Sequence, residues 1–213
     1  MGIASFSGAS SVIKPGVVTS STRPSSPFVG QLIYETDTAR LAAYNGSAWV
    51  TQNALQLVKT QTIGSAVSSV AVSDVFSATY DAYKIIITGG VTSASAAILR
   101  FTLGATVTNY YWAQNGRTFA DVDNSGASGG SAVAWRGGGG SSKILNMNVD
   151  LVGPFLSEET YFTGQYLFPT STGSTFNVTG FLDNTTSYTA FTLTPDSGTI
   201  TGGTIRVYGY ANS

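Results

Sequence analysis

The chain has 213 residues, no cysteine, no histidine, a formal net charge of −1 and only 10% charged residues. The missing cysteine excludes disulfides, thiolate catalysis and Cys-ligated zinc, and the missing histidine removes the commonest general base and the commonest metal ligand. A nearly neutral chain without clustered Lys and Arg does not suit nucleic acid, so we expect a protein that binds other chains or sugars, is not an enzyme and needs no cofactor or metal.

Residues 1–27 consist mainly of Ser, Gly, Ala, Thr and Pro. Such a segment cannot bury enough apolar surface to offset its ordering entropy by itself. It is therefore either a flexible tail or an extended attachment arm that a partner holds in place. No basic segment followed by an apolar run is present, and no run of about 20 apolar residues occurs, so neither a signal peptide nor membrane insertion is expected.

Residues 28–54 predict a small β-hairpin module. Leu32-Ile33-Tyr34 favours a strand, Thr36-Asp37-Thr38 favours a turn, and residues 41–44 resume an apolar run. Asn45-Gly46 then predicts a second tight reversal, and Trp49 follows as an apolar anchor. A lone hairpin is only marginally stable in water, so this module must lean on the next domain or on copies of itself.

Three motifs within residues 22–50 resemble a module found in tail fibres and other virion proteins of tailed bacteriophages. The family pattern runs T-R-P, then G-Q-x-I-Y-x-T-D-T, then Y-x-G-x-A-W. Its elements stand here as Thr22-Arg23-Pro24, Gly30-Gln31-Leu32-Ile33-Tyr34-Glu35-Thr36-Asp37-Thr38 and Tyr44-Asn45-Gly46-Ser47-Ala48-Trp49. The match covers about a seventh of the chain.

The resemblance implies a tail fibre or receptor-binding protein of the virion, assembled in the host cytoplasm. It also implies a homotrimer that joins other virion proteins through its N-terminal arm and presents a β domain for attachment to a host cell-surface glycan. Two alternatives stay open: a head fibre or capsid decoration protein with the same fold, and a glycan-cleaving virion enzyme.

Residues 55–213 read as a series of strand-length runs with no sustained helical period. The runs are 55–63, 66–72, 83–88, 98–103, 110–113, 132–135, 144–151, 161–168, 176–182, 188–193 and 204–210. Short strands at regular spacing predict an all-β domain, an antiparallel β-sandwich that is jelly-roll-like. The last run, 203–210, also resembles the closing strand of C-terminal β domains in the same phage proteins.

Strict alternation identifies the expected core of this sandwich. The predicted core residues are Leu99, Phe101, Leu103, Leu145, Met147, Val149, Leu151, Phe176, Val178, Leu182, Phe191, Leu193, Ile205 and Val207. Between residues 113 and 143 the pattern becomes irregular, and the Gly129-Gly130 and Gly137-Gly138-Gly139-Gly140 runs predict long loops.

Aromatic residues flank these glycine-rich segments and form the candidate binding site. Tyr110, Tyr111, Trp112 and Trp135 supply rings that can stack on sugar faces, and Asn115, Asp121 and Asp123 supply acceptors for sugar hydroxyls. The alternative is that about half of these aromatic residues fill the core or a subunit interface.

Two acidic patterns are weaker. Asp121, Asp123, Ser125 and Gly126 begin like a calcium loop, but Ala132 stands where the bidentate Glu is needed, so an exposed turn is favoured. Glu158, Glu159 and Asp150 could supply a glycosidase pair by composition, but the adjacent glutamates of a strand point to opposite faces and cannot act on one bond together.

Overall fold

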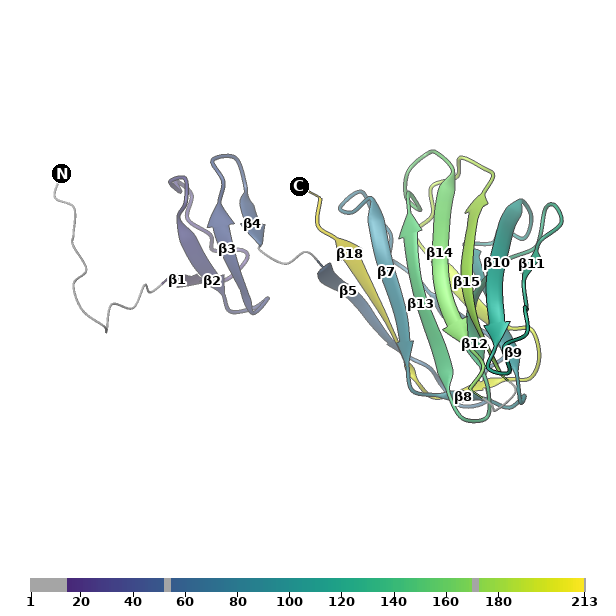
Figure 1. Cartoon of the computed structure of the whole chain (residues 1–213). Coiled ribbons are helices and arrows are strands. Elements are labelled where there is room, and N and C mark those ends of the chain that lie inside the picture. The colour runs from purple at the N-terminus through teal and green to yellow at the C-terminus, as the bar shows by residue number, and fades with distance from the viewer. Residues whose placement is uncertain (1–14, 52–54, 170–172, 213) are drawn as a thin grey trace. The chain divides into compact units, whose positions relative to one another are not determined.

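The computed structural model describes residues 15–51, 55–169 and 173–212. Clustering of contacts divides the chain into two compact units, Met1–Ala54 and Leu55–Ser213 (Figure 1). Both are built from strands and turns, which confirms the all-β prediction. The described segments contain no helix long and apolar enough to cross a membrane.

The first unit is a four-stranded sheet. Its strands are β1 (Gly16–Val18), β2 (Leu32–Glu35), β3 (Arg40–Tyr44) and β4 (Trp49–Thr51), in that spatial order. β2, β3 and β4 are antiparallel neighbours, as the hairpin pattern predicts. The turn after β3 forms because Asn45 Oδ1 accepts the Ser47 and Ala48 N–H groups at 2.9 and 2.8 Å.

Part of the expected arm, residues 1–27, joins the sheet of the module. β1 pairs with β2 in parallel, so Gly16–Val18 is a strand of that sheet. The pairing is favourable because it satisfies backbone groups that β2 would otherwise leave open at its edge. Residues 1–14 of that arm lie outside the described residues.

One face of this small sheet is apolar and exposed. Register aligns Val17 with Tyr34 and Leu41, and aligns Leu32 with Ala43 and Val50. The exposed large residues of these rows are Val17, Leu32, Tyr34, Leu41 and Val50. On the opposite face Ile33 and Ala42 are completely buried. The unit thus buries little apolar surface of its own.

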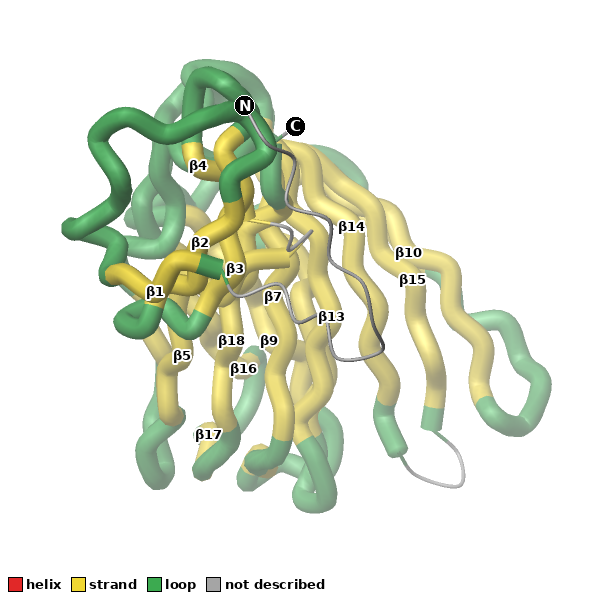
Figure 2. The backbone as a smooth tube through the Cα atoms, turned by 90° about the vertical axis from the view of Figure 1, so that its left-hand side faces the viewer, coloured by secondary structure: helices red, strands yellow, loops and turns green. Residues whose placement is uncertain are grey.

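The second unit contains a large antiparallel layer of strands (Figure 1), which is part of a branched 12-stranded sheet. They are β5 (Leu55–Thr62), β7 (Ala82–Thr88), β10 (Tyr110–Thr118), β11 (Gly126–Ala127), β13 (Leu145–Val152), β14 (Thr160–Leu167), β15 (Ser174–Leu182) and β18 (Thr204–Tyr210). The spatial order is β11-β10-β15-β14-β13-β7-β18-β5. Figure 2 shows β7, β13, β14, β15 and β10 side by side, with loops at both ends of the strands.

A smaller sheet covers one face of the large one. It consists of β12 (Trp135–Gly140), β9 (Ala97–Leu103), β16 (Phe191–Pro195) and β6 (Val70–Val72), in that order. A separate ribbon pairs β8 (Val91–Thr92) with β17 (Ile200–Thr201). The two layers meet where β12 pairs with both β9 and the start of β13.

A single hydrophobic cluster lies between the two layers. All fourteen predicted core residues are buried, which confirms the alternation pattern on which they depended. Aromatic rings connect the layers: Phe162 of the large sheet lies 4.8 Å from Trp135 and 5.9 Å from Phe101 of the small sheet, between ring centroids.

The prediction of a loop at Gly137–Gly140 is wrong, since these glycines form most of β12. Glycine is needed at these positions because a larger residue would not fit. A Cβ on Gly138 would lie 2.8 Å from the Asn146 carbonyl oxygen, and one on Gly139 would lie 2.7 Å from that of Leu167. β12 therefore approaches the other layer so closely that a side chain at these positions would collide with the backbone.

Candidate binding face

The outer face of the large sheet is open and polar. Along β13 the residues alternate between buried apolar side chains and partly exposed Asn146, Asn148 and Asp150. β14 and β15 repeat this alternation with exposed Thr163, Gln165, Asn177 and other polar residues. Because successive side chains of a strand point to opposite faces, packing one face on the core places all of these polar groups on the other.

Four amide side chains stand in one row across this face, which we call the amide row. Register aligns Asn148 with Gln165, Gln165 with Asn177, and Asn177 with Asn115, on β13, β14, β15 and β10. Gln165 Nε2 donates a hydrogen bond to Asn177 Oδ1 at 2.9 Å. Amides both donate and accept, so the row presents the groups that bind sugar hydroxyls.

Asn148 holds an acceptor that lacks a partner. Its Oδ1 is buried and accepts no hydrogen bond from any described residue. A buried acceptor left unsatisfied costs about 1–3 kcal/mol, which favours a donor from water or from a ligand at this position. Asn148 also lines two adjoining surface hollows of about 420 and 470 Å³, and both hollows include Gln165 and Asn177.

Next to the amide row lies a charged cluster whose groups are paired with one another. Lys84 Nζ lies 2.7 Å from Asp150 Oδ2, and the Tyr210 hydroxyl donates to Asp150 Oδ1 at 2.5 Å. This hydrogen bond, burial and the nearby carboxylate charge raise the pKa of Tyr210 to about 12. Both oxygens of Asp150 are thus engaged by neighbouring side chains.

An aromatic row lies further along the same face. Register aligns Tyr161 with Phe181 and Phe181 with Tyr111. The Tyr111 and Phe181 rings stack with centroids 5.0 Å apart, and Tyr161 is 53% exposed. Phe181 follows Asn177 by four residues, so the two rows are separated by about 13 Å along the strand. Rings at this distance from amides can pack on the C–H face of a bound sugar.

The structure does not bring the seven predicted site residues together. Tyr110 and Trp135 are completely buried, so their prediction as ligand-stacking residues is corrected here. The Trp135 Nε1–H group is shared by the Tyr111 and Phe181 carbonyl oxygens at 3.2 and 3.3 Å. The Tyr110 hydroxyl accepts the Leu103 N–H at 2.7 Å. Both polar tips are therefore satisfied inside the protein, as buried Tyr and Trp require.

The other aromatic and amide predictions fall on two faces of β10. Tyr111 and Asn115 lie on the outer face, in the aromatic row and the amide row. Trp112 lies between them in sequence and points to the other side, where the Arg136 guanidinium is 4.6 Å from its ring centroid. Alternation within one strand separates these neighbours.

Asp121 and Asp123 lie in the turn between β10 and β11 and are exposed. Arg117 pairs with both carboxylates, at 2.6 Å from Asp121 and 3.7 Å from Asp123. The described residues contain no group of three or more acidic side chains placed to hold a metal ion. The aspartates thus hold the turn through Arg117.

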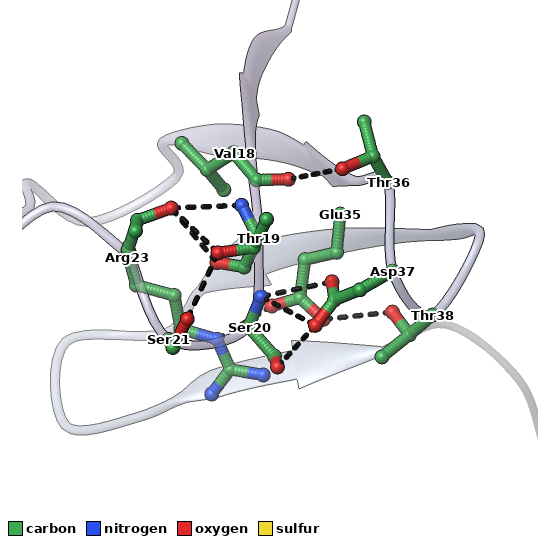
Figure 3. Close-up of polar contacts among 10 residues, drawn as sticks. Val18, Thr19, Ser20, Ser21, Arg23, Glu35, Thr36, Asp37 and Thr38 are labelled. Atoms are coloured by element: carbon green, nitrogen blue, oxygen red, sulfur yellow. Dashed lines mark hydrogen bonds and ion pairs between the residues drawn. The ribbon is translucent and has the colours of Figure 1, made fainter.

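The residues of the N-terminal motif contact one another (Figure 3). Arg23 Nε donates to the buried Glu35 carboxylate at 2.5 Å, and the Thr38 hydroxyl donates to its other oxygen at 2.9 Å. Ser20 donates to Asp37 through its N–H and its hydroxyl. The bonds from Arg23 hold the pKa of Glu35 below its ordinary value despite burial, and those from Ser20 lower the pKa of Asp37. These polar residues shape the module, and their charges are already paired.

The sequence prediction missed most of the outer face. Asn148, Gln165 and Asn177 were visible as the polar partners of the alternating core residues, but their alignment depends on register between strands. Tyr161 and Phe181 were read only as parts of strands. Comparisons with protein-family models, with curated proteins and with solved structures found no match to this chain. The resemblance over residues 22–50 therefore rests on its sequence motifs alone.

Proposed function

We propose that this chain is a structural protein of a tailed-bacteriophage virion, a tail fibre or receptor-binding component without catalytic activity. Its sandwich binds a glycan on the host cell surface through the amide row and the aromatic row. The observation that carries the proposal is the register of Asn148, Gln165, Asn177 and Asn115 on an exposed sheet face, with a buried unpartnered acceptor among them.

The chemistry of the face supports binding over catalysis. Asp150 is its acidic group next to the amides, and it is paired with both Lys84 and Tyr210. Hydrolysis of a glycosidic bond needs one carboxylic acid and one carboxylate on opposite sides of the bond. An open row of amides instead suits reversible binding of a neutral polyol.

Assembly with other copies is the second part of the proposal. The motif over residues 22–50 resembles modules of virion fibres, and the first unit exposes an apolar sheet face that includes Val17, Leu41 and Val50. Exposed apolar patches of this kind are typical of contact surfaces between chains. We propose a homotrimer that joins other virion proteins through the N-terminal unit, with residues 1–27 included.

A glycan array tests the binding function. The purified chain should bind a subset of neutral glycans and release no product, and the double substitution Gln165→Ala/Asn177→Ala should abolish that binding. Thr60→Ala is the matched control, because Thr60 is an exposed polar residue of β5 in the same sheet, away from the amide row. Equal loss in the control, unchanged binding in the double variant, or a released sugar would refute the proposal.

Labelling of intact particles tests the assembly role. An antibody against the sandwich should decorate the tail if the chain is a fibre or receptor-binding protein. Decoration of the capsid would favour the head-fibre alternative, and a protein found in no particle would refute the virion assignment. The mass of the purified chain in solution should correspond to three copies.

A further inference from the structure

Another, smaller hollow lies at the side of the sandwich where β12 faces β10. It measures about 180 Å³, and its lining residues include Ile98, Arg100, Trp112, Val133, Arg136 and Asp196. We call it the arginine groove. Its volume is below the range of about 300–1,000 Å³ for sites of drug-sized ligands, so it has room for one small ring.

Two arginines on neighbouring strands line the arginine groove. Arg136 of β12 and Arg100 of β9 are direct cross-strand partners. Like charges at opposed positions of a strand pair destabilise it. Arg23, Lys84 and Arg117 each form an ion pair, whereas neither Arg100 nor Arg136 pairs with a carboxylate of the described residues. The groove therefore favours an anion between the two guanidinium groups.

Arg136 is already oriented for such a ligand. Its guanidinium lies 4.6 Å from the centroid of the half-buried Trp112 ring, a cation–π distance. This contact restricts the Arg136 side chain before a ligand arrives. Guanidinium groups bind planar carboxylates through two parallel hydrogen bonds.

The other walls of the groove indicate what the anion is attached to. Asp196 is fixed in place because its Oδ1 accepts the Ile98 N–H at 2.9 Å while its own N–H donates to the Ile98 carbonyl. A fixed carboxylate accepts hydrogen bonds from hydroxyl groups. Val133 is 54% exposed and, with Ile98 and Trp112, supplies an apolar wall.

We propose that the arginine groove binds a carboxylate-bearing sugar such as a uronic or sialic acid. Arg100 and Arg136 hold the carboxylate, Asp196 accepts hydroxyl protons, and the apolar wall contacts the C–H face of the ring. The proposal goes beyond the glycan-binding function of the amide row, because it names an acidic sugar and a different surface.

Titration of the full chain with D-galacturonate tests this site, with D-galactose as the neutral analogue and inorganic phosphate as the simple anion. The chain has three tryptophans, so the Trp112 indole N–H can be assigned in NMR spectra with a Trp112→Phe variant. Galacturonate should shift the Trp112 signal saturably, and added salt should weaken the effect. Galactose and phosphate should each bind about tenfold more weakly or worse, since each lacks one part of the recognition.

Arg100→Gln should weaken galacturonate binding by about tenfold or more, as expected for loss of a charge-assisted contact. Arg206→Gln is the control, because Arg206 lies on β18 and donates to Thr88. Arg136→Gln provides a second test from the other side of the groove. Equal affinity for galacturonate and galactose, phosphate binding as tight as galacturonate, or equal effects of Arg100→Gln and Arg206→Gln would each overturn the proposal.

The galacturonate titration and the glycan array test the two proposed sites independently. Gln165→Ala/Asn177→Ala should leave the galacturonate titration unchanged, since the amide row does not line the arginine groove. Neutral glycans that still bind while galacturonate fails would reject the acidic site alone. Galacturonate that still binds while the glycan array shows no loss in the double variant would reject the role of the amide row alone.

Discussion

A few ion pairs among the described residues show which charged side chains stabilise the fold. Glu35 is 1% exposed and is held by Arg23 and Thr38. A buried carboxylate with one partner removed is strongly destabilising, because the remaining charge stays out of water. Arg23, Asp37 and Thr38 of the N-terminal motif thus stabilise the module itself through contacts within it.

Acid should destabilise the N-terminal module through Glu35. Its pKa in the folded protein is below the ordinary value of 4.5, first because of the hydrogen bond from Arg23. A carboxyl group of lowered pKa stabilises the fold above its unfolded pKa, and this stabilisation is lost as pH falls through the folded pKa. Carboxyl NMR titration of Glu35 should show the lowered value, and amide exchange in β2 and β3 should accelerate over the same pH range.

Glu35→Gln should remove most of this acid dependence and leave the smaller part due to Asp37, whose pKa is also lowered. Arg23→Gln should raise the pKa of Glu35, because burial then acts without its main opposing contact. An unchanged Glu35 pKa in Arg23→Gln would show that the ion pair does not exist in solution.

Individual site residues were the hardest to predict from the sequence. Tyr110, Tyr111 and Trp112 are consecutive, yet only Tyr111 lies on the outer face. Aromatic residues favour cores and binding faces alike, so composition near a glycine-rich segment could not separate the two roles. The alternation that separates them was recognised in β9 and β13, where Leu and Phe mark the inner face, but all three residues of this run are aromatic.

At the level of elements, strands with strict alternation were predictable and the glycine strand was not. β9, β13, β14, β15 and β18 lie within one or two residues of their predicted ranges. β12 was missed because glycine runs usually mark loops, whereas these glycines let two layers approach. A long-range contact decides their role, and no local pattern contains it.

Gly139→Ala should destabilise the sandwich by about 1–3 kcal/mol, as expected for overpacking against atoms that cannot move aside. The added Cβ would lie 2.7 Å from the Leu167 carbonyl oxygen. Gly126→Ala is the matched control, because the nearest atom to a Cβ there is 3.8 Å away and β11 is a strand as well. Its change should stay within about 0.5 kcal/mol. Urea denaturation followed by tryptophan fluorescence measures both, and equal effects would show that the glycines are not needed for space.

For the whole molecule, the fold class and the core followed from the sequence, but the binding face did not. The alignment of Asn115 with Asn177 joins strands about sixty residues apart in the chain. Register between such strands depends on the packing of the entire sandwich. The sequence therefore indicates that each residue of the amide row is polar and points outward. Only the three-dimensional structure shows that these residues align in one row.

The two units should differ greatly in their ability to fold alone. The hydrophobic cluster of the second unit is built from buried residues between Ile63 and Val207. A chain that begins at Leu55 should therefore keep its free energy of unfolding in urea within about 1 kcal/mol of that of the sandwich in the full chain. Residues 1–54 alone should show no cooperative transition, because among their described residues only Ile33 and Ala42 are buried apolar side chains.

A sandwich that unfolds at lower urea without residues 1–54 would show that the N-terminal unit supports it directly. A cooperative transition of residues 1–54 at low protein concentration would show that the small sheet needs no partner for its exposed apolar face.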